Sequence, residues 1–195
     1  MRSVIKKIIK NIDYFLWLFR CKYALTMQGF VGLSRLISLL PKVHIIPILK
    51  HYGATIGKNS DIDIGILLHR IKIPLKNLII GENVHIGHYT LFDLTEEIKI
   101  DDNSAIGSFC MFITHAGDWT YDRSDEHEKR GAVIIGKSVI IYSGCIISPN
   151  VKISDYARIG ANSTVLSDIP PFEFHAGSPA VFKKDRRALF NDDKS

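Results

Sequence analysis

The chain has 195 residues, of which 46% are hydrophobic, so it can bury a core and is not expected to be disordered throughout. Its net charge of +5 is uneven, because residues 1–50 carry nine basic side chains and one acidic side chain, Asp13. The remainder therefore carries a net charge of −3, which argues against a nucleic-acid partner bound along the whole molecule. Three cysteines without CxxC spacing favour a reducing, cytoplasmic compartment.

Residues 1–53 are predicted to form a basic, amphipathic helical appendage. Apolar residues recur at spacings of three and four from Val4 to Phe19, with lysines between them. No stretch reaches the roughly 18 uncharged apolar residues that a membrane span needs, and the pattern of a signal peptide is missing. Two roles stay open. The appendage caps the domain that follows, or residues 1–40 contact a membrane surface through Trp17 and the phenylalanines beside the lysines.

Residues 54–182 carry a hexapeptide repeat. A period of six drifts around a 3.6-residue helical turn, so it builds no apolar stripe on a helix. It suits a solenoid in which each hexad gives one short strand and one corner, three hexads make a coil, and the β-branched residues stack inward. The repeat is clearest at six β-branched positions: Ile135, Ile141, Ile147, Ile153, Ile159 and Val165.

Three segments break this regularity. Residues 66–78 keep the spacing only formally and are expected to form a distorted coil or loop. Residues 116–131 are polar and aperiodic, which predicts an excursion loop from one corner. The repeats end at Asp168-Ile169-Pro170-Pro171, because proline cannot donate to the next ladder. Residues 183–195 are expected to be a basic tail that begins with a short helix.

His115 is the leading catalytic candidate from the pattern alone, because it directly precedes the excursion, which can wall a cleft. A histidine titrates near neutrality and can remove a proton from a hydroxyl or an amine. The alternative is an ordinary polar residue at a corner. Cys145 occupies an inward repeat position and is interpreted as a small core residue.

Several stretches resemble the hexapeptide-repeat acyltransferases, in particular the branch of maltose and galactoside O-acetyltransferases and related surface polysaccharide O-acetyltransferases. The resemblance covers about Ala54 to Lys184. The matching stretches are Ile100-Asp101-Asp102-Asn103, Phe112-Ile113-Thr114-His115, Val133-Ile134-Ile135-Gly136-Lys137-Ser138-Val139, Ile159-Gly160-Ala161-Asn162-Ser163 and Ala176-Gly177-Ser178-Pro179-Ala180.

This resemblance implies a mainly β fold: a left-handed parallel β-helix with the helical appendage and a short C-terminal helix. It also implies a homotrimer with active sites between subunits, acetyl-CoA as the co-substrate, no metal, and His115 as the general base. The positions that match the family's cofactor contacts are Ser143, Gly160, Ala161 and, near the nucleotide phosphates, Lys183 and Lys184.

The chain also departs from the family pattern. His88 stands where the family has a catalytic asparagine, five residues before Asp93, which keeps the family's carboxylate. Asp118, Trp119 and Tyr121 in the excursion are candidates for acceptor contact or for orienting His115, as are Glu126 and Glu128. Ile140 and Tyr142 replace the usual tryptophan and glycine. His69 is an alternative base, since serine acetyltransferase-like relatives carry a catalytic histidine there.

The expected function is O-acetylation of a sugar hydroxyl in bacterial surface glycan or polysaccharide biosynthesis, with a sugar or a lipid-linked glycan as the acceptor. The expected location is the cytoplasm, peripherally at the inner face of the membrane if the appendage contacts lipid. Two alternatives remain: a non-catalytic β-helix that binds a glycan or partner, and a γ-class carbonic anhydrase-like zinc enzyme using His85, His88 and His115.

Overall fold

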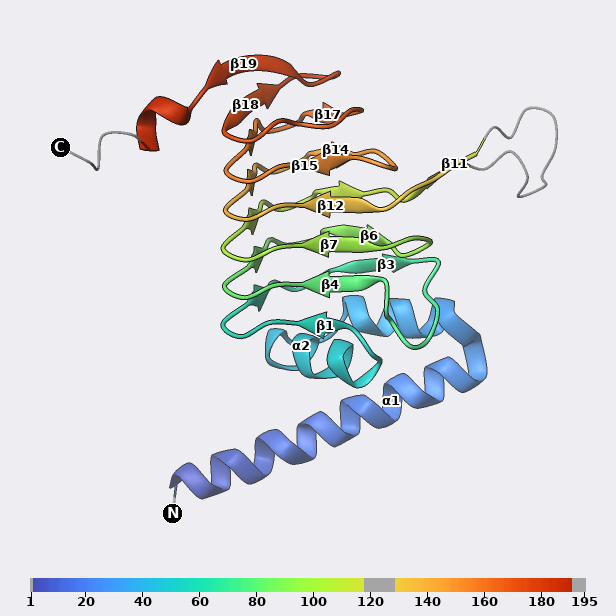
Figure 1. Cartoon of the computed structure of the whole chain (residues 1–195). Coiled ribbons are helices and arrows are strands. Elements are labelled where there is room, and N and C mark those ends of the chain that lie inside the picture. The colour runs from blue at the N-terminus through green and yellow to red at the C-terminus, as the bar shows by residue number, and fades with distance from the viewer. Residues whose placement is uncertain (1, 118–128, 191–195) are drawn as a thin grey trace.

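The computed structural model describes residues 2–117 and 129–190 and forms a left-handed parallel β-helix with two helices at its N-terminal end (Figure 1). Within these residues the coils build three parallel sheets. Sheet A contains, in spatial order, β1 (Thr55–Ile56), β4 (Leu78–Ile80), β7 (Ile98–Ile100), β12 (Val133–Ile135) and β15 (Lys152–Ile153). Sheet C contains β3 (Leu67–His69), β6 (Leu91–Asp93), β9 (Met111–Phe112), β14 (Ile146–Ile147) and β17 (Thr164–Val165).

Sheet B is extended beyond the regular coils. Its strands are β2 (Asp61–Ile62), β5 (His85–Ile86), β8 (Ala105–Ile106), β13 (Ile140–Ile141), β16 (Arg158–Ile159), β18 (Glu173–Ala176) and β19 (Val181–Asp185). β18 pairs in parallel with β16, and β19 then pairs antiparallel with β18. In sheet B, the edge of β16 is therefore covered by a hairpin.

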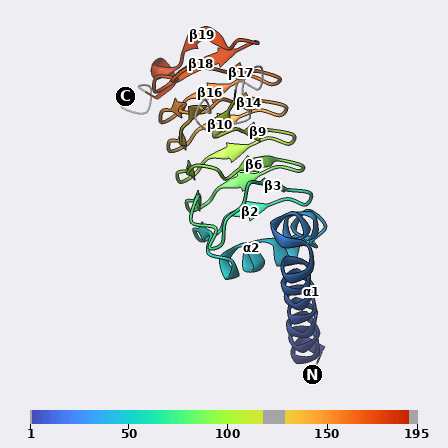
Figure 2. The same cartoon turned by 90° about the vertical axis from the view of Figure 1, so that its right-hand side faces the viewer.

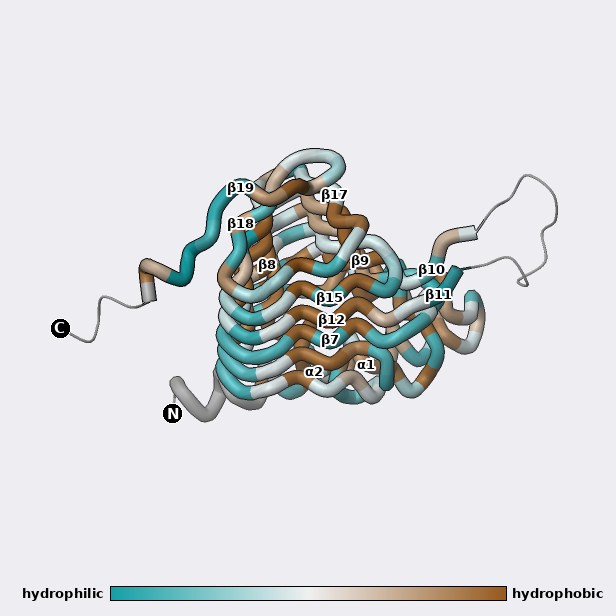
Figure 3. The backbone as a smooth tube through the Cα atoms, turned by 45° about the horizontal axis from the view of Figure 1, so that its top comes forward, coloured by the Kyte–Doolittle hydropathy of each residue, from teal (hydrophilic) through white to brown (hydrophobic). Residues whose placement is uncertain are grey.

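The repeat residues stack as the sequence predicts. Ile135 lies opposite Ile153, Ile141 opposite Ile159, and Ile147 opposite Val165 in neighbouring coils. All six are fully buried. Figure 3 shows the hydrophobic residues aligned from coil to coil across β7, β12 and β15. Burial of this ladder supplies the main driving force for folding.

The corners are tight because the coils approach closely. A Cβ atom added at Gly107 would lie 2.5 Å from the Ser143 backbone nitrogen of the next coil. The glycine in the Ile106-Gly107 step therefore serves close approach of backbones.

The helical appendage consists of α1 (Arg2–Ser38) and α2 (Lys42–His51). Gly29 adopts a left-handed φ of 62° and divides α1 into an N-terminal arm (residues 2–28) and a C-terminal arm (residues 30–38). Leu33 and Ile37 of the C-terminal arm and Ile48 of α2 are completely buried against the first coils. Figure 2 shows the N-terminal arm projecting away from the solenoid.

Neither helix, over its described residues, has both the length and the apolar character required to cross a bilayer.

Two local predictions need correction. Residues 67–69 of the expected distorted coil form β3, which pairs in register with β6, so the irregular part begins after His69. Lys183 and Lys184 lie in strand β19, not in a helix, because the outer edge of β18 offers backbone hydrogen bonds to this segment. The C-terminal helix is a short 3₁₀ helix, η2 (Arg187–Phe190).

The excursion begins as a hairpin. β10 (His115–Ala116) pairs antiparallel with β11 (Lys129–Arg130), so that His115 lies opposite Arg130. His115 thus stands where the chain leaves the solenoid.

Candidate active site

Three side chains meet where strands of sheet C end. His69 is the last residue of β3, Asp93 is the last residue of β6, and the two are register partners in neighbouring coils. His115 comes from the next coil, as the first residue of β10. One ligand-capable atom from each of the three lies within 4.8 Å of the others.

Asp93 is the centre of this cluster. Its side chain is 1% exposed, and its Oδ2 accepts hydrogen bonds from the Thr114 backbone nitrogen (2.9 Å), the His115 backbone nitrogen (3.1 Å) and the His115 ring. Its Oδ1 accepts a hydrogen bond from the Thr95 hydroxyl at 2.8 Å. Burial opposes ionisation of Asp93, but hydrogen bonds from Thr114, His115 and Thr95 outweigh it and lower its pKa to about 2.

The contact with Asp93 determines which ring nitrogen of His115 carries the proton. An ionised carboxylate can only accept hydrogen bonds, so Nδ1 of His115 must donate to Asp93. The lone pair of the neutral ring then resides on Nε2. The His115 side chain is 15% exposed, so it is held in place yet reachable from outside. This is the arrangement of an oriented general base.

His69 is the outermost member of the cluster. Its ring stacks on the His115 ring with centroids 5.5 Å apart and planes at 19°. Its Nδ1 lies 3.5 Å from Oδ1 of Asp93, and 55% of its side chain is exposed. His69, Asp93 and His115 form the sole grouping, among the described residues, that is compact enough to hold a metal ion. Within one chain His85 and His88 lie beside Asp63, apart from His115, so these three histidines do not form such a grouping.

His88 lies at the other end of sheet C within one chain. It precedes β6, whereas Asp93 ends β6. Its Nδ1 lies 2.9 Å from Oδ2 of Asp63, and His85 contacts the same carboxylate at 3.9 Å. The structure therefore brings Asp93 and His115 together but keeps His88 apart from them within a subunit.

Of the predicted cofactor residues, Ser143, Gly160 and Ala161 lie at the corner between sheets B and C. Lys183 and Lys184 lie in β19 of sheet B. The Ser143 hydroxyl accepts a hydrogen bond from the Ser108 backbone nitrogen at 3.1 Å. Gly160 lies where a Cβ atom would come within 2.7 Å of the Ala176 side chain, and the neighbouring Ala161 is exposed.

A pocket of about 220 Å³ lies on sheet B. Its lining residues are Tyr142, Arg158, Phe174, Lys184 and Arg186. Three cations and two aromatic rings in one hollow suit a ligand that carries phosphate and a ring system. Lys184 contributes to this pocket. Lys183, the next residue along exposed strand β19, does not line it.

Comparison with known proteins places these features in a family. Residues 132–167 match the family model described as bacterial transferase hexapeptide (six repeats). The galactoside O-acetyltransferase of Escherichia coli (strain K12) is 30% identical over 161 residues, which cover 75% of this chain and 73% of the relative. The chain belongs to the hexapeptide-repeat acyltransferase family.

Two further proteins are similar to this acyltransferase. WcaF of Escherichia coli (strain K12), provisionally assigned as a colanic acid biosynthesis acetyltransferase, is 28% identical over 141 residues, covering 71% of this chain and 73% of WcaF. A galactoside acetyltransferase solved in complex with coenzyme A superposes with a TM-score of 0.65 at 25% identity, covering 73% of this chain and 70% of that structure.

Several residues of the candidate site were not predicted from the sequence. Thr95 and Thr114 complete the hydrogen bonding of Asp93, and the Thr-His step was the signal for Thr114. Arg158 and Arg186 belong to the basic pocket. Burial, followed by the nearby charge of Arg186, lowers the pKa of Arg158. The position of Arg158 in the hexapeptide repeat does not distinguish it from other outward-facing residues.

The predicted acceptor contacts Asp118, Trp119 and Tyr121 lie outside the described residues, as do Glu126 and Glu128.

Proposed function

We propose that this acyltransferase transfers the acetyl group of acetyl-CoA to a sugar hydroxyl during biosynthesis of a bacterial surface glycan. The observation that carries this proposal is the Asp93–His115 pair at the root of the hairpin. The similarity to galactoside O-acetyltransferase and to WcaF supports the sugar acceptor and the glycan pathway.

His115 acts as the general base. Its Nε2 takes the proton of the acceptor hydroxyl while that oxygen attacks the thioester carbonyl of acetyl-CoA. The tetrahedral intermediate then breaks its carbon–sulfur bond, and the proton passes from His115 to the departing CoA thiolate. Asp93 holds the ring in the required tautomer and stabilises the imidazolium that forms between these steps.

Acetyl-CoA binds along the corner that carries Ser143, Gly160 and Ala161. Its phosphates meet the basic pocket, where Lys184, Arg158 and Arg186 supply charge-assisted hydrogen bonds. Lys183 adds positive charge on the same strand. The CoA-bound galactoside acetyltransferase supports this class of donor.

The working enzyme is a homotrimer with each active site between two subunits. His88 and His115 belong to opposite ends of sheet C, so one chain alone cannot bring both to the same acceptor. Side-by-side packing of solenoids allows His88 of one subunit to face His115 of the next, where His88 would donate a hydrogen bond to the acceptor or the oxyanion.

The N-terminal arm places the enzyme peripherally on the cytoplasmic face of a membrane. Ile12, Phe15, Leu16 and Phe19 are each more than half exposed, and the arm carries six basic residues against one acidic residue. Sedimentation with anionic vesicles tests this contact. The double variant Phe15→Ser, Phe19→Ser should bind vesicles more weakly, and unchanged partitioning would contradict the assignment.

Calorimetric titration with acetyl-CoA tests the proposed function without knowledge of the acceptor. We expect saturable binding of one acetyl-CoA per subunit, in the wild type and in His115→Ala alike, since His115 contacts the acceptor. Acetyl transfer in an acceptor screen should be lost in His115→Ala. A folded trimer that binds no acetyl-CoA would refute the proposal and favour a non-catalytic glycan-binding scaffold.

A further inference from the structure

A cleft of about 390 Å³ separates the C-terminal arm of α1 from the end of β3. Its helical wall comes from Phe30, Val31, Ser34 and Arg35, and its solenoid wall comes from residues 68–71. The Ser34 hydroxyl donates a hydrogen bond to the Leu68 carbonyl, which ties the two walls together. The cleft is therefore held open by the packing of the appendage on the solenoid.

The lining of this cleft combines apolar side chains with one arginine on each wall. Phe30 and Val31 are 48% and 62% exposed, which leaves a hydrophobic surface at the bend of α1. Arg35 and Arg70 contribute guanidinium groups, whose planar donors match phosphate oxygens. None of the described residues that line the cleft is acidic. This combination suits a ligand with a phosphate group and a hydrocarbon chain.

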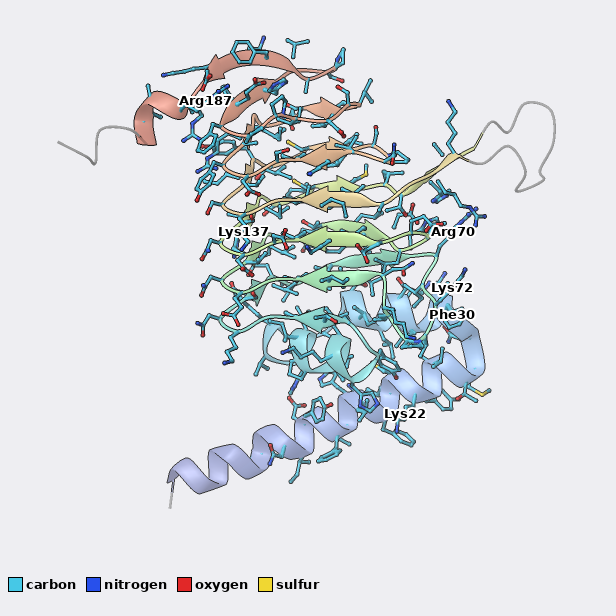
Figure 4. The ribbon with its side chains drawn as sticks, viewed as in Figure 1. Lys22, Phe30, Arg70, Lys72, Lys137 and Arg187 are labelled. Atoms are coloured by element: carbon cyan, nitrogen blue, oxygen red, sulfur yellow. The ribbon has the colours of Figure 1, made fainter. Side chains whose placement is uncertain are left out.

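One residue of the cleft contacts the candidate base. His69, part of its solenoid wall, stacks on His115 with ring centroids 5.5 Å apart. Figure 4 shows Arg70 and Phe30 at the same edge of the molecule, with Lys72 between them and Lys137 at the opposite edge. A ligand in the cleft can therefore extend past His69 toward His115.

We propose that this cleft binds the lipid-phosphate end of the acceptor, and this inference rests on the proposed function. The acceptor is then a glycan joined through phosphate to a lipid chain. The chain lies over Phe30 and Val31, the phosphate meets Arg35 and Arg70, and the sugar passes His69 to present its hydroxyl to Nε2 of His115.

The exposed stripe on α1 supports a lipid chain over a free sugar in this cleft. Phe19, Tyr23 and Met27 follow one another at a spacing of four residues, all are more than half exposed, and the stripe leads to Phe30 at the bend. A chain that leaves the cleft therefore continues along the surface that we place on the membrane. A free sugar supplies neither a hydrocarbon chain for the apolar residues nor a phosphate for the arginines.

Calorimetric titration with dodecyl phosphate below its micelle concentration tests the cleft, with inorganic phosphate and the uncharged detergent dodecyl maltoside as comparison ligands. The full chain is used as wild type, Arg35→Gln, Val31→Ser and the control Lys137→Gln, which removes an exposed cation at the far edge. We expect dodecyl phosphate to bind the wild type more tightly than either comparison ligand. Arg35→Gln should weaken it about tenfold, Val31→Ser should weaken it less, and Lys137→Gln should leave it unchanged.

Equal affinity of wild type and Arg35→Gln would overturn the proposal, as would inorganic phosphate binding as tightly as dodecyl phosphate. Titration of the same samples with acetyl-CoA separates the two proposals. Acetyl-CoA binding without dodecyl phosphate binding would overturn the cleft assignment alone. Dodecyl phosphate binding that depends on Arg35, without acetyl-CoA binding, would support the cleft and contradict acetyl transfer.

Discussion

At the scale of single residues, the site depends on one buried carboxylate. Asp93 is surrounded by donors from Thr95, Thr114 and His115, so it stays ionised although it is almost completely inaccessible. Because Asp93 accepts the hydrogen bond from Nδ1, the lone pair of the neutral His115 ring lies on Nε2. The chemistry of His115 thus follows from its neighbour in the preceding coil.

Replacing Asp93 by asparagine should separate geometry from charge. Asp93→Asn preserves the size of the side chain but removes the negative charge that stabilises the imidazolium and selects the tautomer. We expect kcat to fall by about 10³–10⁴, with little change in acetyl-CoA affinity. Steady-state kinetics would measure this, with Asp101→Asn, whose carboxylate pairs with Lys99 on the surface, as the control. A loss of less than tenfold would show that Asp93 is not needed to orient the base.

The low pKa of Asp93 also predicts an acid limit to stability. Its pKa is depressed in the folded protein, so its contribution is complete above the ordinary carboxyl pKa of 3.8 and disappears as the pH falls toward about 2. This contribution to the free energy of unfolding is about 2 kcal/mol. Urea unfolding of wild type and Asp93→Asn between pH 6 and pH 2.5 measures it. The wild-type advantage should shrink below pH 4, and a constant difference would contradict this assignment.

At the scale of elements, each short strand is stabilised by stacking on the coils above and below it. β15 has one outward residue, Lys152, and one inward residue, Ile153, which lies between the register partner Ile135 and the bridge to Ile169. A strand of two residues has no stability of its own, so burial of the inward side chain supplies most of its contribution to the free energy of folding.

The effect of a truncation within β15 on the free energy of unfolding should therefore depend on whether the inward or the outward side chain is changed. Ile153→Ala leaves a cavity in a fully buried ladder and should lower the free energy of unfolding by about 2–5 kcal/mol. Lys152→Ala in the same strand is exposed and should change it by less than about 0.5 kcal/mol. Urea denaturation at fixed protein concentration would check both values. Equal effects of the two variants would contradict the stacking account.

At the scale of the whole molecule, the appendage and the solenoid combine in one functional surface. The C-terminal arm of α1 buries Leu33 and Ile37 on the first coils and supplies one wall of the cleft that we propose for the acceptor. The N-terminal arm keeps an apolar stripe exposed, and membrane contact through this stripe is our proposal. On that proposal, capping and membrane contact belong to different parts of the same helix.

Subunit mixing should test the shared active site. His88→Ala and His115→Ala homotrimers should each be impaired. If a site uses His115 of one subunit and His88 of the next, trimers reassembled from equal amounts of both variants contain intact sites. Activity should then recover to about one quarter of the wild-type value. No recovery after verified exchange of subunits would show that the site lies within one chain or does not use His88.

The sequence alone determined the architecture, because a six-residue period is a local property that repeats wherever the chain completes a side of the coil. It also singled out His115, where that period stops, and the amphipathic appendage. The partners of His115 were harder to predict from the sequence. Spacing is irregular in residues 66–78, and the repeat restarts at Leu94, only two residues after Phe92. The register therefore cannot be counted from coil to coil.

Tertiary structure decided the rest. Hydrogen bonding between β3 and β6 places His69 beside Asp93, and the following coil brings His115 onto both. Lys183 and Lys184, which were expected in a helix, form a strand because they pair with the edge of β18. The bend at Gly29 sets Arg35 opposite Arg70. Apart from the β18–β19 hairpin, these arrangements join segments that are distant along the chain, so they depend on how coils and helices pack and not on any local pattern.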